Sequence, residues 1–130
     1  MPIIDIELVE DDPKIEPDTH GVRDSSVAQK LADELGTLLN SEAGGTWIRL
    51  RSLPRSCYAE NNTTLPDQVR PVFVHILHSQ LPETAVLALE AEQICHVVSR
   101  ILGRPQENVH ILYLPEGQHR IAFGGKLLRA

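Results

Sequence analysis

The chain has 130 residues, of which 42% are hydrophobic and 23% charged, a composition typical of a single globular domain with its own core. Its 18 acidic and 12 basic side chains give a net charge of −6. This charge argues against binding to nucleic acids or anionic membranes, because both require a basic surface. No apolar run is long enough to span a membrane, and we expect no signal peptide. Cys57 and Cys95 have neither a metal-binding nor a redox spacing, so we expect free thiols in a reducing, cytoplasmic compartment.

The first half of the chain is predicted to form a strand, a helix and a second strand. Residues 2–9 (PIIDIELV) alternate apolar and polar side chains, as a half-buried strand does. A loop with two prolines and a glycine follows, and residues 24–40 then place apolar side chains at helical spacing, with an N-cap expected among the first three. Residues 46–53 (TWIRLRSL) alternate again, which indicates a second strand.

The second half repeats this order. Residues 71–78 (PVFVHILH) indicate a strand that opens with a proline. Residues 82–103 form the clearest helical pattern, with one apolar stripe, a proline in the expected first turn and Gly103 as the expected stop. Residues 108–114 (NVHILYL) indicate another strand, and the glycine pair in residues 120–128 (RIAFGGKLL) indicates a short strand or hairpin.

The order strand, helix, strand therefore occurs twice. The whole chain, residues 1–130, is expected to be one domain built from two similar units, about residues 2–58 and 71–128. Each unit opens with a proline, which is Pro2 in the first and Pro71 in the second. Parallel strands joined by a crossover helix bury both faces of a sheet, so we expect one sheet with both helices packed across it.

Two stretches of the chain resemble the tautomerase superfamily, whose members include 4-oxalocrotonate tautomerase and macrophage migration inhibitory factor. Residues 108–128 (NVHILYLPEGQHRIAFGGKLL) are similar to the second strand and C-terminal glycine hairpin of 4-oxalocrotonate tautomerase, and residues 47–55 (WIRLRSLPR) to a strand of the inhibitory-factor branch. The resemblance implies an α+β fold in which two tandem β-α-β units form a four-stranded mixed sheet, with two helices on one face and a short C-terminal strand. It also implies a homotrimer that uses no cofactor and no metal.

Pro2 is the first candidate catalytic residue. Proline after methionine favours removal of Met1, which leaves a secondary amine at the start of the first strand. An α-amino group titrates near pH ~8, and burial or nearby cations lower its pKa, so this amine could act as a general base at neutral pH. A proline that only starts a strand is the alternative, and Pro71 is an example of it. Together with the resemblance, the position favours catalysis by Pro2.

Three arginines are candidates for binding an anionic substrate. Arg49 and Arg51 lie on one side of their predicted strand, and guanidinium groups on a largely buried strand need anionic partners. A substrate carboxylate could satisfy them through paired hydrogen bonds, and Arg55 is a further candidate of this kind. The resemblance places Arg49 at a carbonyl-binding arginine of 4-oxalocrotonate tautomerase. Salt bridges to Glu7, to Glu60 or to a neighbouring chain are the alternative.

His110, Tyr113 and Glu116 are candidates from the second unit. His110 occupies the strand position equivalent to Arg49, and it could polarise a carbonyl or donate to an enol oxygen. A lone histidine in a strand is also often only a satisfied polar group. Tyr113 could contact substrate, and Glu116 could activate water as an acid does in the related dehalogenase and hydratase branch, although Pro-Glu-Gly is also an ordinary turn.

The chain also departs from the pattern it resembles. The arginine of 4-oxalocrotonate tautomerase that grips a second carboxylate is replaced by Asp12 in the first unit and by Leu81 in the second. A monocarboxylate or keto–enol substrate therefore fits better than a dicarboxylate. We predict a cofactor-independent tautomerase of small 2-oxo or 2-hydroxy-enoic acids, with Pro2, Arg49 and His110 as catalytic residues. Two alternatives stay open: a hydratase, dehalogenase or decarboxylase on the same scaffold, and a non-catalytic ligand-binding trimer.

Overall fold

The computed structural model describes residues 2–12 and 25–129. Met1, most of the expected first loop and the candidate cap Asp24 lie outside the described residues. The described elements, in chain order, are β1 (Ile3–Glu10), α1 (Ser25–Leu38), β2 (Trp47–Pro54), η2 (Arg55–Cys57), β3 (Val72–Leu77), α2 (Thr84–Leu102), η3 (Gln106–Asn108), β4 (Val109–Tyr113), β5 (Ala122–Phe123) and β6 (Lys126–Leu127).

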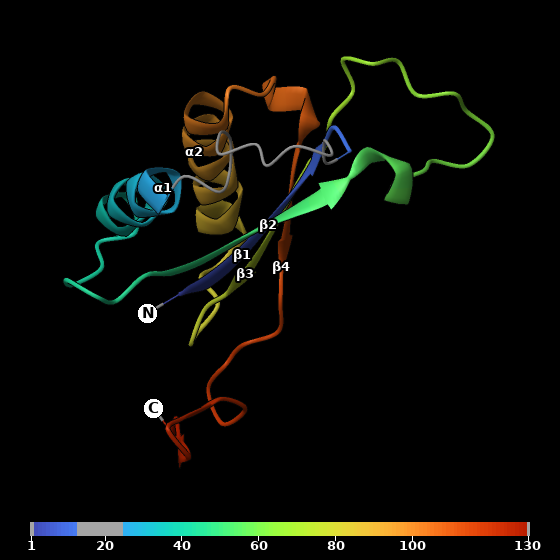
Figure 1. Cartoon of the computed structure of the whole chain (residues 1–130). Helices are drawn as coiled ribbons and strands as arrows, with labels where there is room; N and C mark the ends of the chain where they lie inside the picture. Colours follow the sequence, from blue (N-terminus) through green and yellow to red (C-terminus); the bar gives the residue numbers. More distant parts are fainter. Residues whose placement is uncertain (1, 13–24, 130) are drawn as a thin grey trace.

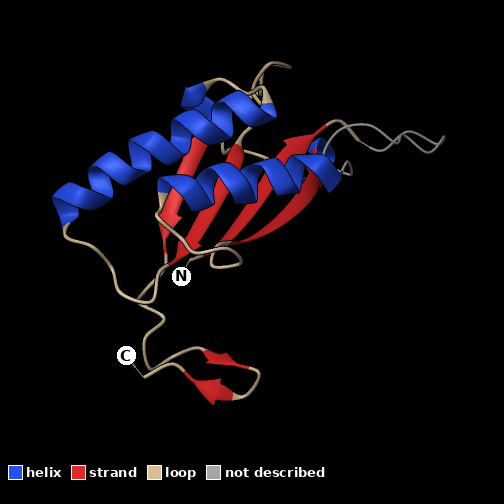
Figure 2. Cartoon of the chain, turned by 90° about the vertical axis from the view of Figure 1, so that its left-hand side faces the viewer, coloured by secondary structure: helices blue, strands red, loops and turns tan. Residues whose placement is uncertain are grey.

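The strands β1 to β4 form one mixed sheet in the order β2-β1-β3-β4. Strand β1 is parallel to β2 and antiparallel to β3, and β3 is parallel to β4. Each parallel pair is joined through one helix, and both helices cover the same face of the sheet (Figure 1 and Figure 2). The expected α+β architecture, with two β-α-β units and two helices on one face, is therefore confirmed.

The core lies between the helices and the covered face of the sheet. Alternate residues of β1 and β3 point to that face and are at most 2% exposed, and α1 and α2 each contribute two fully buried side chains from their apolar stripes. Burial of one such aliphatic side chain stabilises the fold by about 1.5–3 kcal/mol. The central members of the core are Ile4, Ile6, Leu8, Val72, Val74, Ile76, Leu31, Leu35, Ile94 and Val98.

The C-terminal end of α2 is where the sequence predicts it, but its N-terminal end is not. The helix stops at Gly103, which has a left-handed φ of 66° and whose N–H bonds to the carbonyl of Ser99. That conformation is easy for glycine and strained for other residues, so the expected stop is confirmed. At the other end the cap residue is Glu83, and Pro82 therefore precedes the helix instead of lying in its first turn.

Arg49 and His110 occupy equivalent places in the two units. Arg49 pairs with Asp5 of the neighbouring strand in the first unit, and His110 pairs with Phe73 in the second. All four residues face the side of the sheet away from the helices, because the buried positions of their strands alternate with them. With Arg49 and His110 taken as equivalent positions, Asp5 of β1 corresponds to Phe73 of β3, which is an offset of 68 positions.

The prolines that open the two units, Pro2 and Pro71, do not occupy the same position relative to the sheet. With an offset of 68 positions, the counterpart of Pro71 is Ile3. Neighbouring residues of a strand face opposite sides of the sheet. Pro71 therefore does not reproduce the surroundings of Pro2, and the two prolines are not structural copies of each other.

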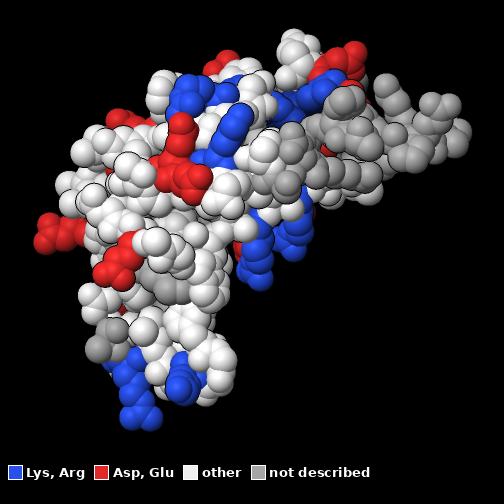
Figure 3. Space-filling model, turned by 60° about the vertical axis from the view of Figure 1, so that its left-hand side comes forward, with Lys and Arg blue, Asp and Glu red and all other residues white. Residues whose placement is uncertain are grey.

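The C-terminal segment forms the expected hairpin, from β5 and β6. Gly124 and Gly125 make its turn with positive φ values of 57° and 85°. The hairpin stands apart from the main sheet (Figure 1 and Figure 2), and its Phe123 ring meets the ring of Trp47 edge-on, with centroids 5.5 Å apart. It carries Lys126, and basic side chains gather at this end of the molecule in Figure 3.

The sheet face away from the helices is uncovered within the described part of the chain. It carries charged, aromatic and aliphatic side chains together, and its Leu112 is 53% exposed. No helix among the described residues is long and apolar enough to cross a membrane. The side chains of this uncovered face include Asp5, Arg49, Arg51, Phe73, His75, His110 and Leu112.

Candidate active site

Pro2 directly precedes β1 and is buried. Its carbonyl oxygen accepts a hydrogen bond of 3.1 Å from the N–H of Trp47, which ties it to the start of β2. In this register the buried Thr46 lies beside Pro2 on one side. The antiparallel pairing with β3, continued by one residue, brings His78 to its other side. Pro2 is thus enclosed between two strand neighbours at one end of the sheet.

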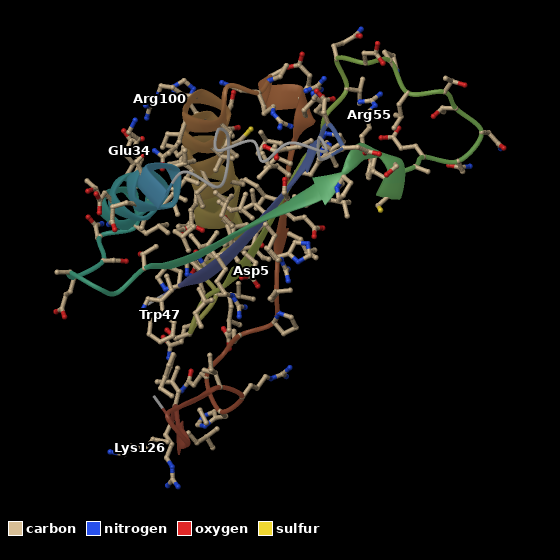
Figure 4. The ribbon with its side chains drawn as sticks, in the orientation of Figure 1. Asp5, Glu34, Trp47, Arg55, Arg100 and Lys126 are labelled. Carbon is tan, nitrogen blue, oxygen red and sulfur yellow. The ribbon has the colours of Figure 1, made fainter. Side chains whose placement is uncertain are left out.

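A small apolar hollow of about 10 Å³, enough for a single water molecule, lies at this end of the sheet on its uncovered side, the side opposite to the one that Pro2 faces. It is formed where the end of the sheet meets the C-terminal hairpin, and Figure 4 places Trp47 between the two. A Cβ on Gly117 would lie 3.3 Å from Ile121, so glycine permits the close packing there. The walls are apolar except for one hydroxyl, and include Ile3, Leu77, Ser79, Ile121, Phe123 and Leu128.

Arg49 is held by Asp5 of the same chain. Its Nε and one terminal nitrogen donate to the two carboxylate oxygens over 2.5 Å and 2.7 Å. The hydrogen bond and charge of Asp5 raise the pKa of the Arg49 guanidinium, and the Arg49 side chain is 69% exposed. The salt-bridge interpretation of Arg49 is therefore realised, but the partner is Asp5 and not Glu7 or Glu60.

Arg51 and His110 lie in a different row of the sheet from Arg49. The row runs from Arg51 through Glu7 and Phe73 to His110, and the rings of Phe73 and His110 are 5.7 Å apart. Arg51 has no hydrogen bond or ion pair among the described residues. Glu7 is five positions beyond Pro2, which corresponds to about 16 Å along a strand. The structure therefore does not bring His110 or Arg51 to the Pro2 of the same chain.

Arg55 is committed to the backbone of the loop that links the two units. Its two terminal nitrogens donate to four carbonyl oxygens, at distances from 2.8 to 3.4 Å. A guanidinium surrounded by carbonyls in this way fastens the loop to the start of η2. The accepting carbonyls belong to Leu65, Pro66, Asp67 and Val69.

Glu116 and Asp12 both bind backbone N–H groups. The Glu116 carboxylate accepts a 2.9 Å hydrogen bond from the N–H of Leu81, which connects the segment after β4 to the segment before α2. The Asp12 carboxylate accepts a 3.0 Å bond from the N–H of Ser56, and this bond holds the pKa of Asp12 below its usual value. The two positions where the sequence departs from 4-oxalocrotonate tautomerase, Asp12 and Leu81, thus both take part in structural contacts.

Tyr113 lies on the helix-covered side of β4, away from the arginines. Its hydroxyl donates to the carboxylate of Glu90 over 2.6 Å, and burial together with that hydrogen bond raises the pKa of Tyr113 far above its ordinary value. Glu90 also lies 2.9 Å from Nε2 of His78. Tyr113 therefore lies near the Pro2 end of the sheet. It contacts Glu90 on the helix-covered side and does not line the hollow.

Sequence reasoning missed the immediate neighbours of Pro2. Thr46, His78 and Ser79 stand beside it or line the hollow, yet none carries a motif. The signal available was the register, because each lies just outside a strand that pairs with the first one. No group of three or more His, Cys, Asp and Glu side chains in the described residues could hold a metal ion.

Comparison with solved structures identifies the fold. A macrophage migration inhibitory factor homologue from Prochlorococcus marinus matches with a TM-score of 0.68 and 15% identity, over 97% of this chain and 98% of the other. A fused 4-OT, described as an asymmetric trimer, matches with a TM-score of 0.69 and 17% identity, over 95% of both chains. Pt0534, in a form inactivated by 2-oxo-3-pentynoate, matches with a TM-score of 0.72 and 10% identity, over 97% of this chain and 95% of the other.

The chain therefore has the fold of the tautomerase and macrophage migration inhibitory factor superfamily, as the sequence resemblance predicted. Sequence comparison adds nothing to this assignment: no protein-family model matches the chain, and no curated protein matches it. This chain has a buried proline directly before its first strand, and one sheet face is open within the described residues.

Proposed function

We propose that this protein is a cofactor-independent tautomerase of small 2-oxo or 2-hydroxy-enoic acids. Once Met1 is removed, the secondary amine of Pro2 takes a proton from a carbon next to the substrate carbonyl and returns it to another atom of the same molecule. The observation that supports this proposal is the burial of Pro2 at the start of β1. Burial disfavours the charged form of an amine, which lowers its pKa toward the neutral range where a general base works best.

The substrate carboxylate is bound by arginine on the uncovered sheet face. Arg51 supports this role most directly, since it is exposed and without a partner among the described residues. Arg49 takes part only if the substrate competes with Asp5 for its guanidinium. Paired hydrogen bonds from a guanidinium stabilise both the carboxylate and the negative charge that develops on the enolate oxygen.

The working form is a homotrimer. The uncovered face, with Leu112 half exposed, and the protruding hairpin, with Leu127 47% exposed, leave apolar surface that a second and third copy would cover. The fused 4-OT with the same fold is described as a trimer. Because His110 and Arg51 lie far along the strand from their own Pro2, we assign them to the Pro2 of a neighbouring subunit.

One alternative keeps specific support. The neutralised Arg49 favours a non-catalytic trimer that binds a ligand, because the pair with Asp5 removes a cation from the site. A hydratase, dehalogenase or decarboxylase would need an acid that activates water, and the engaged carboxylate of Glu116 argues against that residue. In either case the substrate or ligand would be a small carboxylate.

The test is an assay of ketonisation with a simple enol such as phenylenolpyruvate. Loss of Met1 is first verified by intact mass. Pro2→Ala should lower kcat/KM by about 100-fold or more, the usual range for loss of a general base. Pro105→Ala, at an exposed proline next to η3, is the control and should leave activity unchanged. Full activity in Pro2→Ala would overturn the proline mechanism, and no activity in processed protein would favour the ligand-binding alternative.

A further inference from the structure

A partly buried polar group of three side chains, His78, Glu90 and Tyr113, lies at the Pro2 end of the sheet, on the side covered by α2. The Glu90 carboxylate accepts the hydroxyl hydrogen of Tyr113 over 2.6 Å and lies 2.9 Å from Nε2 of His78. The His78 and Glu90 side chains are each only 12% exposed. The rings of His78 and Tyr113 stack with centroids 5.9 Å apart and planes inclined by 16°. The imidazole of His78 is therefore fixed by a carboxylate on one side and an aromatic ring on its face.

These contacts decide which ring nitrogen of His78 is free. A carboxylate can only accept, so the hydrogen between the two groups sits on Nε2. In neutral imidazole Nδ1 is then an acceptor, and only Nε2 of the ring makes a hydrogen bond among the described residues. The arrangement is that of a carboxylate that orients a histidine and leaves its second nitrogen open to a neighbour.

The neighbour supplied by the sheet is Pro2. Ile3 pairs with Leu77, and the next antiparallel pair along the same register joins Pro2 to His78. Paired residues of adjacent antiparallel strands have Cα atoms about 4.5–5.5 Å apart. Pro2 and His78 also share the helix-covered parity of their strands, because Ile4 and Ile76 face the core. The register, continued by one residue, thus puts Pro2 and His78 next to each other with both side chains on the helix-covered side.

We propose that the His78–Glu90–Tyr113 group positions the Pro2 amine: Nδ1 of His78 accepts a hydrogen bond from the amine, and the Glu90 carboxylate is the buried negative charge behind it. The inference rests on the proposed role of Pro2. Burial alone would make the amine a weak base, whereas an acceptor and a negative charge favour its protonated form. The group therefore restores enough basicity for the amine to take a proton from the substrate and return it.

The other charged groups at this end of the sheet do not supply the same effect. Asp5 and Arg49 neutralise each other on the uncovered face. The carboxylate of Glu116 is bound to the N–H of Leu81. Glu83 before α2, Arg120 before the hairpin and Lys126 in the hairpin are exposed and therefore screened by solvent.

The test is a direct titration of the Pro2 amine by NMR in processed protein labelled at proline, with the Pro2 signal assigned by its absence in Pro2→Ala. Glu90→Gln removes the charge but keeps an oxygen that accepts both hydrogen bonds. Glu92→Gln makes the same charge change at an exposed site on the same helix and is the control. His78→Phe keeps the ring stack with Tyr113 and removes the acceptor.

We expect Glu90→Gln and His78→Phe each to lower the midpoint of the Pro2 titration, by on the order of 1 pH unit, and Glu92→Gln to leave it unchanged. An unchanged or raised midpoint in the first two variants would overturn the inference. Should neither variant fold, wild-type protein labelled also at histidine decides, because the proposal requires the His78 signals to change at the titration step of Pro2. The titration needs no turnover. If the protein is inactive but the variants lower the Pro2 midpoint, the inference stands and only the proposed function fails. If the protein is active but the variants leave the midpoint unchanged, only the inference fails.

Discussion

The guanidinium of Arg49 and the carboxylate of Asp5 make a two-point contact between β1 and β2, over 2.5 Å and 2.7 Å. The contact joins residues 44 positions apart in the sequence and lies on the open face of the sheet. Arg49, a candidate for binding a substrate carboxylate, is therefore neutralised by Asp5. Any role of Arg49 in binding a carboxylate must therefore compete with Asp5.

Replacement of Asp5 by asparagine tests that competition. Asp5→Asn keeps an acceptor oxygen but removes the charge, so a free Arg49 should bind a substrate carboxylate more strongly and lower KM, with little effect on kcat. Steady-state kinetics with a carboxylate enol measure this. The control is Glu42→Gln, at an exposed acid in the loop before β2. A KM that stays constant or rises in Asp5→Asn would place Arg49 outside substrate binding.

The trimer can be tested with two exposed aliphatic residues on opposite sides of the molecule. Leu112 on the uncovered sheet face is 53% exposed, and Val86 on α2 is 54% exposed. Leu112→Glu should convert the trimer to monomers, since a charge buried in an interface is costly. Val86→Glu should leave the trimer intact. Sedimentation velocity gives the mass of each species, and a trimeric Leu112→Glu would show that the uncovered face is not the interface.

The elements of this fold were predictable because their signals are local. The alternation of β1 and β3 and the apolar stripe of α2 can be recognised from residues close together in the sequence. Gly103 ends its helix because glycine adopts the left-handed conformation easily. The site was much less predictable, because pairing register is not written in any single strand. The Asp5–Arg49 contact, the place of His78 beside Pro2 and the one-residue offset of Pro71 all depend on that register.

Both tyrosines of the chain should ionise late in alkali. The hydrogen bond to Glu60 is the largest cause that raises the pKa of Tyr58 from its ordinary value of 10.0 to about 12, and burial is the second. Burial and Glu90 raise the pKa of Tyr113 still further. The chain has only these two tyrosines, so tyrosinate absorbance should stay low up to about pH 11 and appear only beyond it.

The raised pKa values of the two tyrosines also make the stability of the fold depend on pH. A tyrosine whose folded pKa lies above its unfolded value adds stability that is fully present below pH 10.0 and is lost as the pH rises through the folded pKa. The free energy of unfolding in denaturant should therefore decline between pH 10.0 and about 12. Absorbance that rises with an ordinary tyrosine midpoint in folded protein would contradict both contacts.

Arg55 should prove to be a structural residue. Arg55→Ala removes a guanidinium that donates to four loop carbonyls, and we expect a loss of about 1–3 kcal/mol in the free energy of unfolding, together with faster proteolysis of residues 59–70. Arg55→Lys should recover only part of this, because an ammonium cannot reproduce the planar fork. KM should stay unchanged in both variants. A large rise in KM with normal stability would instead assign Arg55 to substrate binding.

Glu116 separates the tautomerase from the hydratase alternative. Glu116→Gln keeps an oxygen that can accept the N–H of Leu81, so the connection between the segment after β4 and the segment before α2 should survive. An amide cannot take a proton from water, so hydration of an enoic acid, if it occurs in wild type, would be lost in this variant. Ketonisation should persist, because it depends on the Pro2 amine and needs no activated water. Both reactions are assayed in Glu116→Gln and Glu116→Ala. A catalytic role of Glu116 in hydration would abolish hydration in both variants and leave ketonisation intact. Loss of the hydrogen bond to Leu81 alone would lower both activities together, and only in the alanine variant.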